Sequence, residues 1–221
     1  MAQNIAIDGP SASGKSTVSK GVAQALGFVY VDSGAFYRGV TWHALRQNAD
    51  PNNAEAVLES MHDADWDFFI KDGAVFFSVN GVVPVQELRE KEVREAVALV
   101  AAIPEVRKFV VETLQSLENF GSLVMEGRDI GTVVFPDTPF KFYLDADPEE
   151  RAKRRYRELV AAGENEKAEE VMKSLQQRDQ IDSTRKTAPL SVAPGARVVD
   201  TTNMTLDEVI ETIVKAIKEF A

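Results

Sequence analysis

The chain of 221 residues has a formal net charge of -10 at pH 7 and contains no cysteine. This acidic balance disfavours non-specific binding to nucleic acid or anionic membranes, because both require a surplus of lysine and arginine. The missing thiols exclude disulfides, cysteine nucleophiles and cysteine metal ligands. We therefore expect a cytoplasmic protein with no nucleic-acid or membrane partner, in which any anionic ligand meets a locally basic site.

The length and the hydrophobic content of 44% suit one domain with insertions rather than two independent domains. The longest run of small apolar residues, 96–103, is much shorter than a membrane span. Asp8 interrupts the first apolar run, so we do not expect a secretory signal.

Short apolar runs rich in Val, Ile, Phe and Tyr recur along the chain and predict strands at residues 4–8, 28–32, 122–126, 140–145 and 196–200. Their apolar residues are consecutive rather than alternating, which indicates a parallel sheet covered by helices on both faces. Most of these runs end in a carboxylate, at the edge where open α/β sheets bind ligands. The alternative is that such a carboxylate only caps the next helix.

About ninety residues separate the second and third predicted strands, far more than one crossover helix needs. Asp72-Gly73 and Asn80-Gly81 divide residues 65–86 into three apolar segments, which predicts a three-stranded antiparallel meander with tight hairpin turns. A helical pattern follows over 87–103, and Pro104 opens a further helix to about residue 120.

The segment GPSASGKS, residues 9–16, matches the phosphate-binding pattern GxxxxGK[ST] between a predicted strand and a predicted helix over 15–26. Backbone amides encircle a phosphate only where no side chain intrudes, and Gly9 and Gly14 provide that freedom. Lys15 supplies a charge for the outer phosphates, and the Ser16 hydroxyl can bind Mg²⁺. The motif predicts a magnesium nucleoside triphosphate, ATP, as ligand; the alternative is a plain glycine turn. The predicted nucleotide-binding residues are Gly9, Pro10, Ser11, Ala12, Ser13, Gly14, Lys15, Ser16 and Thr17.

Two further segments carry charged residues at the presumed ligand edge. In DSGAFYR, residues 32–38, Asp32 or Ser33 caps a helix that extends through His43, which leaves Tyr37 and Arg38 unexplained. In EGRDIGTVVFPD, residues 126–137, a turn flanked by glycines carries two adjacent charges of opposite sign. A plain surface turn is the alternative for this second segment.

Two predicted helices carry arginines at spacings that place them on one face: Arg151, Arg154 and Arg155 on the first, and Arg178, Asp182 and Arg185 on the second. Either face could simply be solvated. In a chain with net charge -10 we interpret them as clamps for phosphate groups.

The combination of GPSASGKST, DSGAFYR, EGRDIGTVVFPD and RDQIDSTRKTAPL strongly resembles the bacterial cytidylate kinases, a family of nucleoside monophosphate kinases, over nearly the whole chain. The resemblance implies direct in-line transfer of the γ-phosphoryl group of ATP to CMP or dCMP with Mg²⁺. It also implies an α/β P-loop fold whose five-stranded parallel sheet has the order 2-3-1-4-5, with a small antiparallel β insert and a short helical lid. We expect a monomer.

The resemblance also divides the chain into regions. It implies a core of residues 1–32, 121–150 and 190–221, a monophosphate-binding region over 33–120, and a lid over about 151–170. Closure of the lid would exclude water, and residues 161–164 are our candidate hinge, with an ordinary helix end as the alternative.

Individual positions acquire roles from the same resemblance. Arg107 and Asp129 match residues that read the cytosine, and Asp182 matches a ribose contact. The implied catalytic cations are Lys15, Arg128, Arg151, Arg155, Arg178 and Arg185. The implied monophosphate-binding residues are Ser33, Tyr37, Arg38, Arg107, Arg128, Asp129, Arg178, Asp182 and Arg185, with Ser16 and Asp32 at the metal.

This chain departs from the family pattern in two places. Ala98 stands where a serine usually helps to hold the base, so either a neighbouring residue takes that role or base discrimination is weaker. Pro194-Gly195 stands where acidic residues are commoner, in the segment before the predicted adenine-side loop at 200–203.

Two other functions fit the phosphate-binding motif alone. A small-molecule kinase acting on a hydroxyl would need a carboxylate base, for which Asp32 or Asp129 could serve. A nucleotide-dependent switch would turn over ATP without any acceptor, but it gives no reason for arginines on two additional helices.

Overall fold

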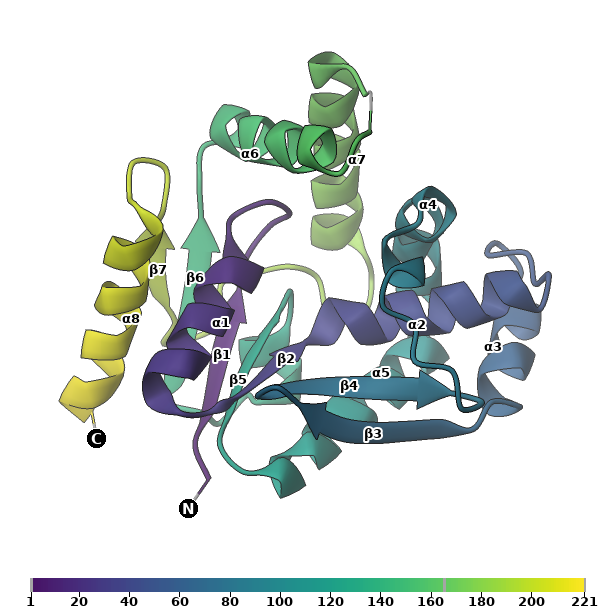
Figure 1. Ribbon diagram of the computed structural model, residues 1–221, viewed down its shortest axis with the longest axis horizontal. Coiled ribbons are helices and arrows are strands. Elements are labelled where there is room, and N and C mark those ends of the chain that lie inside the picture. Colours follow the sequence, from purple (N-terminus) through teal and green to yellow (C-terminus); the bar gives the residue numbers. More distant parts are fainter. Residues whose placement is uncertain (1, 165, 221) are drawn as a thin grey trace. The chain divides into compact units, whose positions relative to one another are not determined.

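The computed structural model describes residues 2–164 and 166–220 (Figure 1). The chain divides into two compact units, which are described separately. The P-loop unit consists of residues 4–27 and 124–221, and the insert unit consists of residues 1–3 and 28–123. Among the helices that the structure describes, none combines the length and apolar character that a membrane span requires.

The P-loop unit is built on parallel strands. Its strands are β1 (Asn4–Asp8), β5 (Leu123–Gly127, which begins at the boundary residue), β6 (Phe140–Asp145) and β7 (Arg197–Asp200). β6 pairs in parallel with β1 on one side and with β7 on the other. β1 and β5 are buried along almost their whole length, in agreement with the consecutive apolar residues that predicted them. Buried residues alternate along β6, and β7 is mostly exposed, so the prediction of continuous burial was wrong for these two strands.

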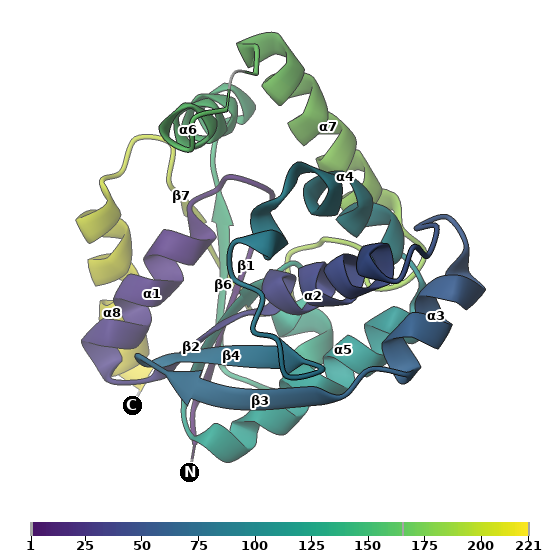
Figure 2. The same ribbon diagram turned by 45° about the vertical axis from the view of Figure 1, so that its right-hand side comes forward.

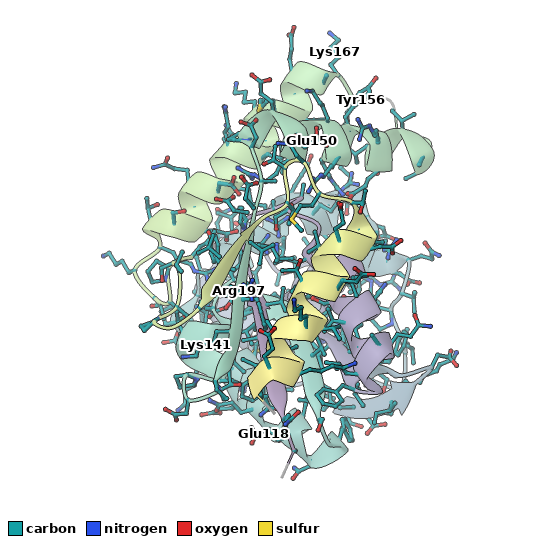
Figure 3. The ribbon with its side chains drawn as sticks, turned by 90° about the vertical axis from the view of Figure 1, so that its left-hand side faces the viewer. Glu118, Lys141, Glu150, Tyr156, Lys167 and Arg197 are labelled. Carbon is teal, nitrogen blue, oxygen red and sulfur yellow. The ribbon has the colours of Figure 1, made fainter. Side chains whose placement is uncertain are left out.

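The helices of this unit carry many of its charged residues. They are α1 (Lys15–Leu26), the π-helix η3 (Ile130–Val134), α6 (Pro148–Ala161), α7 (Ala168–Thr184) and α8 (Leu206–Phe220). α8 packs beside α1, as Figure 3 shows. α6 packs on α7 through Ala152, Leu159, Val171 and Leu175, which form their own apolar cluster.

The C-terminal end of α6 has the hydrogen bonds of a glycine cap. Gly163 has φ +80°, the N–H of Gly163 donates to Val160 O at 3.0 Å, and the N–H of Glu164 donates to Leu159 O at 2.9 Å. Glycine reaches this left-handed conformation without the steric cost of a side chain, so the helix stops here. The cap accounts for the sequence of residues 161–164, and their role as a hinge stays a prediction. Asn165, inside the predicted lid, and the two terminal residues lie outside the described part of the chain.

The insert unit is mostly helical and contains one hairpin (Figure 2). Its elements are β2 (Val29–Asp32), α2 (Ser33–Arg46), α3 (Ala54–His62), β3 (Trp66–Lys71), β4 (Ala74–Val79), η1 (Glu87–Arg89), α4 (Lys91–Val100), α5 (Pro104–Ser116) and η2 (Leu117–Phe120). α2 contacts α3, α4 and α5. An aromatic cluster between α2 and the hairpin consists of Phe36, Trp66 and Phe77. The ring centroid of Phe77 lies 5.2 Å from that of Phe36 and 5.9 Å from that of Trp66.

The predicted hairpin turns are confirmed by their backbone angles, but the meander has two strands rather than three. Asp72, Gly73, Asn80 and Gly81 all have positive φ, as a tight primed turn requires. β3 and β4 pair from Trp66↔Val79 to Lys71↔Ala74. After the second turn only the isolated bridge Val79↔Val82 forms. Pro84 has no N–H to extend that ladder.

The prediction of a five-stranded sheet was wrong in number, because the strands form a mostly parallel seven-stranded sheet with the order β3-β4-β2-β5-β1-β6-β7. The two additional strands are the hairpin. β4 pairs in parallel with β2 at the single position Tyr30↔Ala74, so the hairpin extends the sheet instead of standing apart as a subdomain.

Candidate active site

The phosphate-binding loop has the backbone that its glycines predict. Gly9 has φ +152°, and a Cβ built on it would lie 2.1 Å from the carbonyl oxygen of Leu144 on β6. Gly14 has φ +90° and precedes α1 as its N-cap residue. Side chains at these two positions would clash or strain the backbone, so the sequence GPSASGKS is fixed here by the close approach of the loop to the sheet. The N-terminus of α1 then follows, where backbone N–H groups favour an anion.

Lys15 is buried and points back into the loop. Its ammonium donates to Pro10 O at 2.5 Å and to Ser13 Oγ at 3.3 Å. Burial, with the nearby charges of Arg128 and Arg178, lowers the pKa of Lys15 to about 7, while Glu126 and Asp8 act in the opposite direction. A phosphate placed beside this amine would favour its charged form. The surroundings of Lys15 are therefore suited to an anion.

Arg128 connects the loop to α7. Its Nε donates to Asp182 Oδ2 at 3.0 Å and its Nη2 donates to Ser11 Oγ at 3.0 Å. Burial alone would raise the pKa of Asp182, but the charges of Arg128, Arg178 and Arg185 outweigh that effect and hold the pKa below its usual value. The structure thus brings together the turn at 126–137 and the second arginine face.

Arg185 closes this group at the end of α7. It has Nη2 3.9 Å from Asp129 Oδ1 and Nη1 3.5 Å from Asp182 Oδ1, and its Nε donates to Ala188 O at 2.7 Å. Asp129 and Asp182 are both buried. Two carboxylates among three arginines leave this cluster with surplus positive charge, which is the balance that a phosphate site needs.

The arginines of α6 divide between the loop and its neighbours. Arg151 is buried, and its Nη1 donates to Ser11 O at 3.1 Å and to Asp179 Oδ2 at 2.6 Å. Asp179 also accepts from the Ser11 N–H at 3.4 Å, so this pair braces the loop backbone. Arg155 instead pairs with Glu158 at 3.0 Å. The three arginines at 151–155 therefore do not act as one face.

Arg154 makes a different contact, which its spacing from Arg151 and Arg155 did not predict. Its two terminal nitrogens donate to Thr201 Oγ1 at 3.0 Å and to Thr201 O at 2.7 Å. Thr201 in turn donates to Ser13 O at 3.3 Å. The segment after β7 is thereby linked to the phosphate loop. Sequence reasoning gave no role to Asp179 or Thr201, although Asp179 stands in RDQIDSTRKTAPL and Thr201 in the predicted adenine-side loop, because their partners lie 28 and 47 residues away.

The insert unit holds the remaining predicted residues. Asp32 caps α2 by accepting from the Ala35 N–H at 3.0 Å, as predicted, and its other oxygen pairs with Arg38 Nη2 at 2.7 Å. Arg107 is buried, with its Cζ 5.3 Å from the centre of the Tyr37 ring and its Nη1 donating to Ala101 O at 3.2 Å. Ser33 is buried at the first position of α2.

The site residues therefore form two sets, one within each unit. Ala98, the departure from the family pattern, is half-buried on α4 of the insert unit.

The proposed metal contacts suit Mg²⁺ to different degrees. Ser16 is exposed at the start of α1, and its hydroxyl is a hard oxygen of the kind that Mg²⁺ prefers. Asp32 also offers oxygen, but both of its carboxylate oxygens already accept hydrogen bonds from Ala35 and Arg38. Ser16 with the phosphates of a nucleotide fits the ion, and the role of Asp32 stays a prediction.

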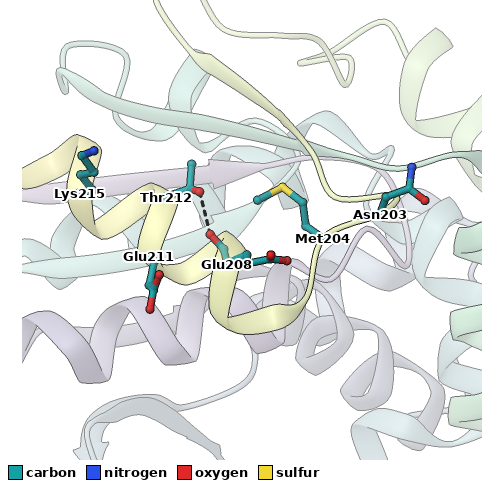
Figure 4. Close-up of a pocket in the computed structure, with 6 residues that line it drawn as sticks. All are labelled: Asn203, Met204, Glu208, Glu211, Thr212 and Lys215. Atoms are coloured by element: carbon teal, nitrogen blue, oxygen red, sulfur yellow. Dashed lines mark hydrogen bonds between the residues drawn. The ribbon is translucent and has the colours of Figure 1, made fainter.

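A pocket of about 390 Å³ lies at the beginning of α8 (Figure 4). It is lined by Asn203, Met204, Glu208, Glu211, Thr212 and Lys215. The Thr212 hydroxyl donates to Glu208 O at 2.7 Å, and the Glu208 carboxylate accepts from Thr205. Two carboxylates make this pocket unsuitable for phosphate. Asn203 belongs to the predicted adenine-side loop, whose role the pocket does not test.

A glycine-rich loop between a buried strand and a helix N-terminus, with a buried lysine and braced arginines, defines a P-loop phosphate-binding protein. A sequence model of the family described as Cytidylate kinase matches residues 5–219. The chain belongs to this family.

Similar proteins agree with that assignment. The chain is 44% identical to the cytidylate kinase of Caldanaerobacter subterraneus subsp. tengcongensis over 97% of this chain and 94% of the relative. It is 44% identical to the cytidylate kinase of Clostridioides difficile over 96% and 97%, and 41% identical to that of Geobacillus kaustophilus over 98% and 96%. The relatives thus match along almost their full length.

Proposed function

We propose that the protein transfers the γ-phosphoryl group of ATP to CMP or dCMP, giving ADP and CDP or dCDP. Family membership supports this reaction. The observation that carries the proposal in the structure is Arg128, which bridges Ser11 of the phosphate loop and Asp182 of α7. It joins the loop to a second cluster of arginines, and two polyanions that react with each other require two such sites.

The chemistry needs positioning and charge rather than a base. The phosphate of a nucleoside monophosphate has a second pKa near about 6, so it is mostly ionised at neutral pH. One of its oxygens attacks the γ-phosphorus, and the bond to the β–γ bridging oxygen breaks. Charge on the transferred group is stabilised by Lys15 and the cations Arg128, Arg151, Arg155, Arg178 and Arg185. When bound, Mg²⁺ would be held by Ser16 and the nucleotide and would neutralise phosphate charge.

Base recognition is proposed for Asp129 and Arg107. Cytosine offers a donor at N4 and acceptors at N3 and O2, so a carboxylate that accepts from N4 and a guanidinium that donates to the acceptors are complementary to it. Uracil would place O4 against the carboxylate, a mismatch that costs on the order of 10² in discrimination in a desolvated site. The burial of both residues in their own units supports this role.

Further parts of the proposal rest on the family resemblance. They are the lid over 151–170, the monophosphate-binding region over 33–120, monophosphate contacts from Ser33, Tyr37 and Arg38, a monomeric state and a cytoplasmic location. The number of strands in the sheet neither supports nor opposes these parts of the proposal.

One assay tests the proposed reaction. ADP release is measured with ATP and Mg²⁺ in parallel with CMP, dCMP, UMP and AMP as acceptors. We expect CMP and dCMP to be the best acceptors, with UMP behind them. Phosphorylation of a non-nucleotide hydroxyl alone, or ATP turnover that no acceptor accelerates, would contradict the proposal and favour another kinase or a switch.

A further inference from the structure

Asp8 is a buried carboxylate that the proposed reaction does not use. It is the last residue of β1, directly before the phosphate loop, and only 2% of it is exposed. Its Oδ1 accepts from the Ile130 N–H and its Oδ2 accepts from the Gly131 N–H, each at 2.8 Å. The reaction needs no general base, and both oxygens of Asp8 are already engaged by backbone N–H groups.

The two N–H groups belong to the beginning of a π-helix. The first N–H groups of any helix have no partner within the helix, and the residue before it commonly supplies a side-chain acceptor. Here that residue is Asp129, and its side chain makes no such bond. Its carbonyl accepts from the Val133 and Val134 N–H groups at 2.9 and 3.2 Å. The carboxylate that caps this turn comes instead from β1, more than 120 residues earlier.

Because Asp8 rather than Asp129 caps this helix, the side chain of Asp129 is available for another contact. A local cap would hold the Asp129 side chain against its own helix. Because Asp8 takes that role, the Asp129 carboxylate lies at 3.9 Å from Arg185 in the arginine cluster. The adjacent Arg128 reaches Ser11 and Asp182 from the same turn. The direction of both side chains depends on where the turn begins.

The arrangement carries an electrostatic cost. Burial raises the pKa of Asp8 to about 6 against the effect of its two N–H donors, and the charge of Asp129 acts in the same direction as burial. Lys15 is the charged group that opposes this rise. A neutral acceptor would avoid the cost of a buried charge, but it could not accept from two consecutive N–H groups with two equivalent oxygens.

We propose that Asp8 is a positioning residue for phosphoryl transfer, which fixes the Arg128–Asp129 turn to the strand that leads into the phosphate loop. The inference rests on the proposed function for its kinetic consequence and on the hydrogen bonds of Asp8 for its physical one. Gly131 fits the same role, because a Cβ there would lie 3.2 Å from Ala193 Cβ, so the turn has little room to shift.

The kinetic test compares Asp8→Asn with Asp137→Asn, a matched change at an exposed carboxylate on the same segment. The asparagine keeps one acceptor but directs an NH₂ group at the second N–H. We expect kcat/KM for CMP to fall about 10²-fold in Asp8→Asn, since small misplacement of reacting groups has effects of that order. The Kd for ATP should change less than threefold, and Asp137→Asn should match wild type. Equal losses for ATP and CMP would overturn the proposal.

A pH series provides a readout that a purely structural role would not move. The ratio of wild-type to Asp8→Asn activity with CMP is measured at saturating ATP, whose phosphates favour the charged form of Lys15 in both enzymes. The ratio then cancels the ionisation of the substrates, which both enzymes share. Above pH 6 Asp8 is ionised and accepts both bonds; below it, protonated Asp8 resembles the variant. The ratio should therefore fall about fourfold between pH 7.5 and pH 5.5, as the ionised fraction of Asp8 falls. A ratio that stays constant over this range would contradict the inference.

If the Asp8→Asn variant does not fold, nuclear magnetic resonance of the wild-type protein without nucleotides can still test whether Asp8 positions the turn. The amide signals of Ile130 and Gly131 and the Arg128 Nε–H signal should share a titration step near about 6, the pKa of Asp8, apart from the step of Lys15 near about 7. Titration of the amides with an unmoved Arg128 signal would show that Asp8 caps the turn without positioning it. If wild type fails to phosphorylate CMP, the proposed function fails, and this titration still decides whether Asp8 holds the turn.

Discussion

The two units hold their charged side chains in different ways. In the P-loop unit, Arg151 is paired with Asp179 and Arg128 with Asp182, carboxylates 28 and 54 residues away in the chain. In the insert unit, Arg38 is paired with Asp32, six residues away on the same helix end. Long-range pairs form only when the whole unit is folded, whereas the Asp32–Arg38 pair needs little more than the first turns of α2.

This difference has an energetic side. The Arg151 side chain is 9% exposed and that of Arg38 is 24% exposed. Pairs that are more buried are screened less by water and salt, so removing one partner leaves a costly uncompensated charge. Loss of one charge from the Arg151–Asp179 pair should therefore cost more than loss of one from the Asp32–Arg38 pair, and the predictions below concern single charges of the P-loop unit, from the largest effect to the smallest.

Lys15→Met should have the largest effect. The ammonium is the charge that lies within the loop itself, and methionine keeps the length of the side chain without it. Loss of a single preorganised charge of this kind costs about 10³-fold in kcat. The measurement is steady-state ADP release with CMP, with Lys173→Met on the exposed face of α7 as the control. A loss smaller than tenfold would show that the loop amides suffice.

The sequence predicted those parts of the site whose determinants are contiguous. GPSASGKS fixes its own backbone through Gly9 and Gly14, and Asp32 caps the helix that it precedes. The contacts Arg151–Asp179 and Arg154–Thr201 could not be predicted, because a pattern on one helix face does not reveal which carboxylate or carbonyl lies opposite. The capping of residues 130 and 131 by Asp8 is of the same kind.

Prediction of the fold from the sequence has the same limit, because long-range pairings are not encoded in local patterns. Strands, helix starts and hairpin turns follow from local patterns, and all five predicted strands of the core are present within a residue or so of their predicted bounds. The number of strands in the sheet depends on one long-range pairing, Tyr30↔Ala74, which no local pattern encodes. The prediction of a third strand in the meander was wrong because it relied on the apolar pattern and neglected Pro84. Proline lacks the N–H donor that a ladder of hydrogen bonds needs.

Arg128→Lys should cost about 10²-fold in kcat/KM for CMP, because one ammonium cannot replace a planar group that bonds Ser11 and Asp182 at once. Arg157→Lys, at an exposed position of α6, is the matched control and should leave the rate near wild type. The two variants need parallel thermal unfolding curves. Equal rates for Arg128→Lys and wild type would show that the bridge is structural only.

Asp129→Ala should impair the use of CMP by on the order of 10²-fold and leave ATP binding nearly unchanged, because its proposed partner is the cytosine amino group. The preference for CMP over UMP should shrink at the same time. Kinetics with both acceptors and ATP titration measure the two effects. An equal loss of CMP use and ATP binding would contradict the base-reading role.

The smallest effect is the proton taken up when nucleotide binds. Burial lowers the pKa of Lys15 to about 7 in the protein without ligand, so at pH 8 most of this amine is neutral. Phosphate oxygens beside it favour the ammonium form and raise its pKa, so binding draws a proton from the buffer. At pH 8 the nucleotide itself is fully ionised, and we expect uptake of somewhat less than about one proton. Calorimetry in buffers of different ionisation enthalpy measures this number directly. Lys15→Met should abolish the uptake, whereas uptake that persists in that variant would assign the proton to another group.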